Sequence, residues 1–555
     1  MNQDKWWVRR WPVASEWMAL IAALYFALVC NGAFWHAFAA AGAWGQPGAW
    51  RLAVGLFVGI VALHTALLLV LLNRWTTRII LPLLLLVTAS AMYYMNQYRV
   101  YLDADMIRNV LATERKEASE LLTPGLAWYV VIYGVVPSLL VWRTRPVQRS
   151  VLRGFLVHVA GIVLALVVAA GAIAASYQPM AAFMRNEKSI RHLITPGNWI
   201  VSLGKVLLGD APRSGPKTRI GQGATLARPT GARPRVLVLA VGETVRAQNW
   251  GLNGYARQTT PQLAGLDGIN YPDVTACGSN TEVSLPCMFS AQGLHDYDRG
   301  NIRDSESVLH LLTRLGIATL WRDNQTGCKG VCSDLPFESF LHANIPAYCD
   351  GERCLDGVLL DGLKSRIEAA PGDVVVVLHM LGNHGPAYYR RYPPEFRRYT
   401  PTCDTDQLAA CQPEAIVNSY DNAILYTDDV LARTVAMLQT LAPSRDAALL
   451  YLSDHGESLG EDGVYLHGLP RAIAPDTQLK VPMWLWLSPQ LQQADGVDMA
   501  CLRRSATKPH THDALFNTVL GLMRVDAKEY SPGQDLLAGC EHKPPAIGAT
   551  GNTPQ

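Results

Sequence analysis

The chain has almost no net charge for its length. Its 555 residues carry 48 Lys and Arg against 46 Asp and Glu, which gives a formal net charge of +2. So small an excess excludes bulk electrostatic attraction to a polyanion, and we expect no nucleic-acid partner. Cysteine is also scarce in the first half, where Cys30 is the only one before Cys277. Charged residues are rare up to about Ser176, because long apolar runs take their place.

Five of these apolar runs are long enough to cross a bilayer as helices. Buried core helices rarely occur as five consecutive runs of this length, so the pattern predicts a transmembrane domain over residues 1–176. The predicted spans are Trp17–Gly42, Trp50–Asn73, Ile79–Tyr98, Leu126–Trp142 and Val151–Ser176.

Basic residues predict the orientation of these spans. The loop Ala43–Ala49 has no Lys or Arg, and in Arg99–Gly125 four basic residues are diluted by five acidic ones. The N-terminus is therefore predicted inside and everything after Ser176 outside. Cleavage of the first run as a signal peptide would leave four spans and the same outside location. The basic residues on the inner side are Lys5, Arg9, Arg10, Arg74, Arg78, Arg143, Arg145 and Arg149.

Ten cysteines follow Ser176, and an even number in an exported segment predicts disulfide bonds. Four pairs are close in sequence, while the distant fifth pair is left open. A four-thiolate zinc site at the two closest pairs is the alternative, which an oxidising compartment disfavours. The pairs are Cys277 with Cys287, Cys328 with Cys332, Cys349 with Cys354, Cys403 with Cys411, and Cys501 with Cys540.

The exported part begins with a connecting segment. Residues 177–234 first show helical spacing suited to the membrane face and then, from Gly209, a Gly- and Pro-rich linker. Residues 235–540 alternate apolar strands with helices, which predicts an α/β domain with a mainly parallel sheet. Residues 541–555 are predicted to be a disordered tail. The predicted strands are Val236–Val241, Gly316–Trp321, Val374–Met380, Ala447–Ser453 and Val481–Leu487.

Polar motifs follow three of these strands. Glu243 follows the first, His379 and His384 lie at the end of the third, and Asp454-His455 follows the fourth. Ligands of parallel sheets bind beyond the carboxyl ends of the strands, so we expect these side chains to meet. Carboxylate and imidazole groups are zinc ligands.

A threonine supplies the reactive group of this predicted site. Thr281 is bracketed by Cys277 and Cys287, and its hydroxyl becomes nucleophilic at neutral pH only when a base or a metal removes its proton. Taken singly, Thr281 could be a helix N-cap and Glu243 a first-turn acid. Together with Asp454 and His455, they favour a metal site.

Other polar residues have two interpretations each. His384 and His467 precede glycines in loops, where they are either solvated or serve proton transfer and phosphate contact. Lys329 is either a solvated charge or a fixed cation facing an anionic substrate. Asn109, Thr113 and Glu117 recur every four residues on a predicted helix that begins at Asp105, so they form one polar stripe. This stripe is either a solvated helix face or a contact for a lipid head group.

At these residues the sequence resembles the phosphoethanolamine transferases that modify lipid A, the group that contains the transferable colistin-resistance enzymes. The resemblance covers most of the chain, including the five spans. Its motifs are Gly242-Glu243-Thr244, the segment Cys277–Cys287 ending in Pro-Cys-Met-Phe-Ser, Asp323-Asn-Gln-Thr-Gly-Cys-Lys-Gly, Asn383-His-Gly-Pro and Ser453-Asp-His-Gly-Glu-Ser-Leu-Gly. Ser279-Asn280 before the threonine and Glu282 after it depart from the family pattern, and Glu282 could alter acceptor preference.

The resemblance implies an alkaline-phosphatase/sulfatase-like fold for the exported domain. It implies that Thr281 is the nucleophile and that Glu243, Thr281, Asp454 and His455 bind Zn²⁺. His384 and His467 would assist substrate binding and proton transfer, with a second metal allowed around them. The residues matching the family's ethanolamine and phosphate contacts are Asn109, Thr113, Glu117, Thr326, Lys329 and His379.

We therefore predict a monomeric, multi-pass enzyme of the bacterial inner membrane with its catalytic domain in the periplasm. It would transfer phosphoethanolamine from phosphatidylethanolamine to lipid A and raise polymyxin resistance. Kdo, core heptose and periplasmic glucan are alternative acceptors, and a non-catalytic sensor is a further alternative. A sulfatase would need a Cys/Ser-x-Pro-x-Arg motif, absent around Thr281, and the clustered cysteines argue against a lipoteichoic-acid-type synthase.

Overall fold

The computed structural model describes residues 11–45, 48–113, 115–209, 216–229 and 231–541. Contacts divide the chain into two compact units: Met1–Leu111 with Leu121–Ala211, and Ala112–Glu120 with Pro212–Gln555. The short segment Ala112–Glu120 therefore belongs to the second unit, although it lies between two apolar runs of the first. The predicted domain boundaries at residues 176 and 234 remain a prediction, and all but the first residue of the predicted tail lies outside the described ranges.

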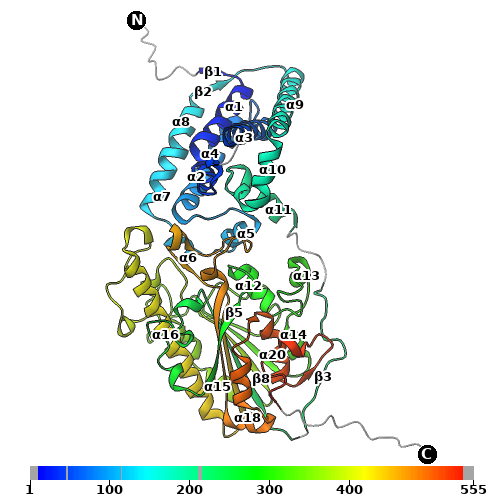
Figure 1. The fold of residues 1–555 in the computed structure, drawn as a ribbon, viewed down its shortest axis with the longest axis vertical. Coiled ribbons are helices and arrows are strands. Elements are labelled where there is room, and N and C mark those ends of the chain that lie inside the picture. Colours follow the sequence, from blue (N-terminus) through cyan, green and yellow to red (C-terminus); the bar gives the residue numbers. More distant parts are fainter. Residues whose placement is uncertain (1–10, 46–47, 114, 210–215, 230, 542–555) are drawn as a thin grey trace, which may run out of the picture. The chain divides into compact units, whose positions relative to one another are not determined.

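The first unit is a bundle of apolar helices (Figure 1). Four segments are long and apolar enough to cross a membrane: α3 (Ala49–Leu71), α4 (Thr77–Tyr98), Pro124–Trp142 and α9 (Val151–Ala175). The first predicted span is instead a pair of helices, Ser15–Cys30 and Gly32–Ala40, bent by 50°. The chain thus has four such helices in its described part, or five if the bent pair is one span.

Asn31 occupies the bend of the first span. Its Nδ2 donates to the carbonyls of Phe26 and Thr195 at 2.8 Å, and its Oδ1 accepts from the backbone N–H of Thr195 at 2.8 Å. The amide thus satisfies backbone groups that the helix ladder leaves unpaired, which is the usual condition for a break inside an apolar segment.

Shorter helices follow the spans. The predicted helix carrying Asn109, Thr113 and Glu117 is in fact two helices, α5 (Ala104–Ala112) and α6 (Arg115–Glu120), so the single polar stripe is wrong. The region after Ser176 forms α10 (Tyr177–Asn186), a 3₁₀ turn (Lys188–Leu193) and α11 (Gly197–Gly209).

The second unit is built on an eight-stranded sheet of order β13-β5-β12-β9-β4-β8-β6-β7. Strand β12 alone runs antiparallel to its neighbours β5 and β9, while the remaining pairs are parallel. This mostly parallel sheet confirms the predicted fold class. The strands are β4 (Arg235–Gly242), β5 (Gly268–Thr275), β6 (Ala318–Asp323), β7 (Phe337–Ser339), β8 (Val374–His379), β9 (Asp446–Ser453), β12 (Lys480–Leu487) and β13 (His510–Thr511).

Helices cover both faces of this sheet (Figure 1). Along β4, Leu237 and Leu239 pack into one core with α12 (Thr281–Met288), α14 (Val308–Arg314) and α20 (Asp513–Leu522). Val236 and Val238 point the other way, into a core with α15 (Leu363–Ala369) and α16 (Pro413–Leu441). Both faces are apolar because side chains alternate along a strand, which explains the continuous apolar runs in the sequence.

The apolar segment before β8 does not form one continuous helix. It is a 3₁₀ turn at Asp356–Leu360 followed by α15. Gly362 separates them with a φ of +64°, a conformation that glycine adopts without steric cost.

Ten cysteines of the second unit form five disulfides, which confirms the predicted pairing of the four pairs that are close in sequence. The distant pair, which the sequence left open, is also bonded. A zinc site built from the four thiolates of the two closest pairs is therefore wrong, because these sulfurs are bonded to one another. The disulfides join Cys277 to Cys287, Cys328 to Cys332, Cys349 to Cys354, Cys403 to Cys411, and Cys501 to Cys540.

The disulfide between Cys403 and Cys411 closes a loop on the α16 side of the sheet. Its sequence separation is 8 residues, and Cys411 lies two residues before Pro413, where α16 begins. The N–H of Cys403 donates to the carbonyl of Ala415 in the first turn of α16 at 3.1 Å. The bond therefore anchors this loop to the start of the helix.

A core substitution tests the importance of the central strands. Leu450 on β9 is fully buried and lies in register with Leu239 and Leu485 of the flanking strands. We expect Leu450→Ala to lower the free energy of unfolding by about 2–5 kcal/mol, because it removes buried methyl groups and leaves a cavity. Leu226→Ala, at a 38% exposed residue, is the control, with an expected change below about 0.5 kcal/mol. Tryptophan fluorescence of the purified chain in urea measures both; equal effects would contradict this core.

Candidate active site

Two adjacent parallel strands deliver the acidic residues of the site. In the register of β4 and β9, Gly242 lies opposite Ser453, so the residues that follow them, Glu243 and Asp454, leave the sheet side by side. The N–H of Asp454 donates to the carbonyl of Gly242 at 2.9 Å. The predicted convergence at the carboxyl ends of the strands is what the structure shows for these two residues.

Thr281 is the first residue of α12. The preceding Asn280 is the N-cap, and its Oδ1 accepts from the N–H of Val283 at 3.1 Å. The interpretation of Thr281 itself as the N-cap is therefore wrong, and its hydroxyl is not used for capping. A helix N-terminus carries partial positive charge, which favours a phosphoryl group bound there.

The loop before Thr281 is held from several sides. The Cys277–Cys287 disulfide joins it to α12, and the N–H of Gly468 donates to the carbonyl of Ser279 at 2.8 Å. Arg471 Nη1 donates to the carbonyl of Ala276 at 2.7 Å. These contacts fix the position of the hydroxyl before any substrate arrives.

A buried histidine joins this loop to the strand that carries Asp454. The Nδ1 of His512 accepts from the N–H of Cys277 at 3.1 Å, and its Nε2 lies 3.0 Å from the carbonyl of Ser453. Burial lowers the pKa of His512 to about 4, so the ring is neutral and can accept at one nitrogen and donate at the other.

The side chains of Glu243, Thr281, Asp454 and His455 lie close together at this end of the sheet. The Oγ1 of Thr281 lies 3.2 Å from Oε2 of Glu243 and 3.4 Å from Nε2 of His455. The same His455 nitrogen lies 3.2 Å from Oε1 of Glu243 and 3.4 Å from Oδ2 of Asp454. Glu243, Asp454 and His455 are fully buried.

The protonation of this cluster reflects its crowding. Burial and the neighbouring charge of Glu243 raise the pKa of Asp454 to about 7. Burial alone would lower the pKa of His455, but Asp454 and Glu243 raise it to about 10. Burial opposes ionisation of Glu243 too, yet the hydrogen bond and charge of His455 hold its pKa below the usual value. Without a metal, protons therefore balance the two carboxylates.

The cluster fits a metal ion. Glu243, Asp454 and His455 offer ligand atoms that lie within 4.8 Å of one another, and Oδ2 of Asp454 has no hydrogen-bond partner among the described residues. Two carboxylates, one imidazole and one hydroxyl form a donor set that zinc accepts. Buried charges of this kind need a counter-charge, which a divalent cation supplies better than protons.

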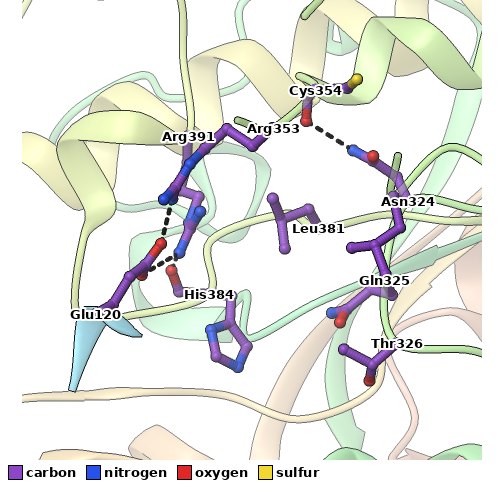
Figure 2. A pocket seen from close by; sticks show the side chains of 10 residues that line it. Glu120, Asn324, Gln325, Thr326, Arg353, Cys354, Leu381, His384 and Arg391 are labelled. Carbon is purple, nitrogen blue, oxygen red and sulfur yellow. Dashed lines mark hydrogen bonds and ion pairs between the residues drawn. The ribbon is translucent and has the colours of Figure 1, made fainter. Parts of the chain in front are cut away.

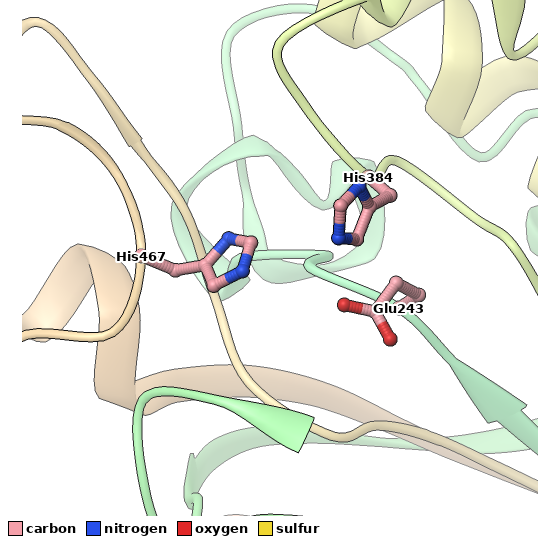
Figure 3. Close-up of side chains that lie close together, drawn as sticks. All are labelled: Glu243, His384 and His467. Atoms are coloured by element: carbon pink, nitrogen blue, oxygen red, sulfur yellow. The ribbon is translucent and has the colours of Figure 1, made fainter. Parts of the chain in front are cut away.

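A second group of ligand atoms adjoins the first. Glu243, His384 and His467 also offer ligand atoms within 4.8 Å of one another, and Figure 3 shows both imidazoles near the Glu243 carboxylate. The Nδ1 of His467 lies 3.0 Å from Oε2 of Glu457, which orients its ring. The rings of His455 and His467 have centroids 4.5 Å apart.

A small cavity of about 50 Å³ lies beside His384. Figure 2 shows Arg353 and Arg391 directed at the carboxylate of Glu120. Arg391 Nη2 lies 2.8 Å from Glu120, and its Nε donates to the carbonyl of His384 at 2.7 Å. Arg391 therefore links the segment Ala112–Glu120 to the backbone of a site histidine.

Further residues that sequence reasoning missed hold the site in place. Gln325 Nε2 donates to Oε2 of Glu243 at 2.6 Å. Asp323 lies 2.7 Å from Nδ1 of the predicted site residue His379, whose Nε2 has no hydrogen-bond partner among the described residues. Asp356 accepts from the N–H groups of Leu381 and Gly382, which fixes the loop before His384. Asp323 could have been found, because it begins the motif Asp323-Asn-Gln-Thr-Gly-Cys-Lys-Gly, two residues after the predicted strand Gly316–Trp321; in the structure it is the last residue of β6.

The structure brings only some of the other predicted substrate-contact residues together. Lys329 Nζ donates to Oγ1 of Thr326 at 2.8 Å, so these two predicted residues are neighbours. Thr113 belongs to the second unit and Asn109 to the first. The side chain of Glu117 lies outside the described residues. Their roles, and those of His379, His384 and His467, remain predictions.

Two family models match different parts of this chain. Residues 235–525 match the sulfatase family model, which places the second unit in that class. Residues 60–211 match the family model described as phosphoethanolamine transferase EptA/EptB.

Individual relatives cover nearly the whole chain. Phosphoethanolamine transferase EptA of Salmonella typhimurium is 39% identical over 84% of this chain and 86% of its own length. Phosphatidylethanolamine transferase Mcr-1 of Escherichia coli is 38% identical over 82% and 85%. The solved integral membrane lipooligosaccharide phosphoethanolamine transferase A of Neisseria meningitidis is 36% identical, with a TM-score of 0.91 over 96% of this chain and 100% of its own. The chain belongs to the phosphoethanolamine transferase family, and the predicted resemblance is confirmed.

The protonation of the cluster predicts how metal affinity depends on pH. Below pH 10 a metal must displace the proton of His455, and below about pH 7 that of Asp454 as well. As the pH is lowered, the affinity of the metal-free protein for Zn²⁺ should therefore fall by about tenfold per pH unit down to pH 7 and more steeply below it. Competition titration with a zinc indicator measures this. In Asp454→Asn the extra steepness below pH 7 should be absent, and a pH-independent affinity would contradict the assignment.

Proposed function

We propose that the chain transfers phosphoethanolamine from phosphatidylethanolamine to a phosphate of lipid A through a covalent intermediate on Thr281. One observation carries this proposal. The hydroxyl of Thr281 takes no part in capping its helix and lies at the helix N-terminus, 3.2 Å from Glu243 and 3.4 Å from His455. A hydroxyl in this position has both a proton acceptor and a site for phosphoryl oxygens within reach.

We further propose that Zn²⁺ is the cofactor, held by Glu243, Thr281, Asp454 and His455. When bound, it would lower the pKa of the threonine hydroxyl and offset the charge of the transferring phosphoryl group. The buried donor set supports this choice, and so does Oδ2 of Asp454, which contacts His455 but has no hydrogen-bond partner among the described residues. The group of Glu243, His384 and His467 supports a second metal site during turnover.

In the first half of the reaction, the Oγ1 of Thr281 attacks the phosphorus of phosphatidylethanolamine. A P–O bond forms to Thr281, and the bond to the diacylglycerol oxygen breaks. The threonine proton is lost toward the Glu243–His455 side, and the leaving oxygen receives a proton. His467, oriented by Glu457, and His384, whose backbone is held by Arg391, are suited to deliver it.

In the second half, an acceptor phosphate attacks the same phosphorus and releases Thr281. Lys329 supplies a cation near the nucleophile, because its partner Thr326 lines the small cavity that also contains Gln325 and His384. The buried ring of His379 is held by Asp323 through Nδ1. Its Nε2 can therefore form a hydrogen bond with a phosphate oxygen.

The proposed acceptor and location rest on the relatives and on the chain's apolar helices. The Neisseria meningitidis relative is named a lipooligosaccharide phosphoethanolamine transferase. The spans and disulfides of this chain suit an inner-membrane enzyme with a periplasmic catalytic domain. We propose a monomer. A non-catalytic sensor is disfavoured, since the nucleophile and every predicted ligand are present and adjacent.

The covalent step predicts a defined adduct. Protein incubated with phosphatidylethanolamine should gain the mass of one phosphoethanolamine on Thr281, and Thr281→Ala should gain none. Intact-mass spectrometry followed by peptide mapping measures this. Thr440→Ala is the matched control, at an exposed threonine distant in sequence whose hydroxyl donates to the carbonyl of Met437 in the same helix. A wild-type protein that transfers phosphoethanolamine without forming any adduct would contradict the covalent mechanism.

The acceptor proposal predicts a change at the cell surface. Phosphoethanolamine adds an ammonium to a phosphate, which lowers the net negative charge and weakens attraction of cationic peptides. Expression in a susceptible Gram-negative host should raise polymyxin resistance, and Thr281→Ala should not. Mass spectrometry of purified lipid A reads the modification directly. Unmodified lipid A beside modified Kdo, core heptose or glucan would reject this acceptor and leave the transferase chemistry standing.

A further inference from the structure

The residue after the nucleophile makes an ion pair. Glu282 follows Thr281 in α12, and its Oε1 lies 3.0 Å from Nζ of Lys329. Both side chains are mostly buried, with 15% and 10% of their surface exposed. Lys329 also donates to Oγ1 of Thr326 at 2.8 Å. The ammonium of Lys329 is thus shared between a carboxylate and a hydroxyl directly beside the reacting threonine.

A second cavity, of about 290 Å³, lies against this ion pair. Its wall is formed by α12, by α13 (Arg299–Asp304) and by the loop that the Cys328–Cys332 disulfide closes. Thr326 lines the small cavity of Figure 2, whereas Glu282 and Lys329 line this larger one. The ion pair therefore lines the larger cavity and also adjoins the site, because Glu282 directly follows Thr281 and Lys329 donates to Thr326.

The lining of the larger cavity carries an excess of positive charge. Four cations line it, Lys217, Arg299, Arg303 and Lys329, against the carboxylates of Glu282 and Glu306. Glu306 is paired with Arg314, which lies outside the lining. Lys217 donates to the carbonyl of Gly330 at 2.5 Å, and the carboxylates of Asp334, Glu306 and Asp304 also act on its charge. Arg303 contacts Asp304 at 3.3 Å and keeps 38% of its side chain exposed.

The two substrates of a transfer reaction differ in charge. The donor phosphate is a diester with one negative charge, whereas a phosphomonoester acceptor is nearly dianionic at neutral pH. Arginine and lysine bind such an anion through charge-assisted hydrogen bonds. The cavity volume lies near the lower limit for ligand sites, which suits one sugar phosphate and not a lipid chain.

We propose that this cavity is the acceptor subsite, where a phosphorylated sugar head group binds with its phosphate between Lys217, Arg303 and Lys329. The proposal rests on the transferase function above. Glu282 competes with the acceptor for Lys329, so the ion pair opens when the phosphate arrives, and Glu282 sets the acceptor's affinity.

The transfer itself balances without any further reactant. One oxygen of the acceptor phosphate forms a new bond to the phosphorus held on Thr281, which creates a diphosphate linkage. The bond between that phosphorus and Oγ1 breaks with its electron pair going to Oγ1. The dianionic acceptor brings no proton, so the departing Oγ1 takes one proton from solvent water, which restores the free hydroxyl.

Separate assays of the two half-reactions test this proposal. The full chain in detergent is first loaded with phosphatidylethanolamine, and the Thr281 adduct is counted by intact mass. Purified lipid A is then added, and loss of the adduct is followed over a range of lipid A concentrations. Dephosphorylated lipid A is the negative control, and Lys364→Gln, at an exposed lysine of α15, is the control variant.

Opposite changes of charge should have opposite effects. Lys217→Gln and Arg303→Gln should load the adduct as the wild type does, but raise the KM for lipid A by more than about threefold, since each removes a partly exposed cation. Glu282→Gln should lower this KM, because Lys329 is then available to the phosphate. A purely structural role would not give opposite signs in proteins with equal thermal stability.

Two results would overturn the subsite. One is a KM for lipid A within about threefold of the wild type in both cation variants. The other is a KM that rises in Glu282→Gln. Failure of the underlying function is distinguishable, because the wild type itself would then form no adduct or would form one that lipid A does not discharge.

Discussion

The site depends on two buried carboxylates, those of Glu243 and Asp454, which offer ligand atoms within 4.8 Å of one another. Glu243 and Asp454 both lie against His455 and have no exposure to water. Such a cluster is stable only if protons or a cation balance its charge. The same crowding that costs stability in the free protein suits the proposed metal site, and it places the hydroxyl of Thr281 3.2 Å from Glu243 and 3.4 Å from His455.

The rest of the catalytic unit keeps this cluster from relaxing. The parallel register of β4 and β9 fixes Glu243 and Asp454 relative to each other. The nucleophile loop is then tied to the same edge by His512, which contacts both Cys277 and Ser453. Because each of these side chains follows a strand end or lies on a clamped helix, we expect little reorganisation when a substrate binds, which is the basis of electrostatic preorganisation.

Much of this could be predicted from the sequence. Continuous apolar strands followed by Glu243, His379 and Asp454 predict a parallel sheet with polar groups at one edge, because burial on both faces leaves a clear pattern. The antiparallel β12 could not be predicted, since its composition resembles that of its parallel neighbours. Residues that act by holding other residues were also missed: His512 and Asp356 lie outside the quoted motifs, and Gln325 lies inside one, but the role of each follows only from tertiary contacts. The bend at Asn31 depends on a distant carbonyl of Thr195, which no local pattern reveals.

Zinc K-edge X-ray absorption of the metal-loaded protein tests the central claim most directly, since it reports the ligands of the metal. The account predicts one shell of oxygen and nitrogen ligands at about 2.0–2.2 Å with imidazole scattering and no sulfur, and a changed oxygen shell in Thr281→Ala. A sulfur shell at about 2.3 Å, or a spectrum unaltered by loss of the threonine hydroxyl, would contradict it.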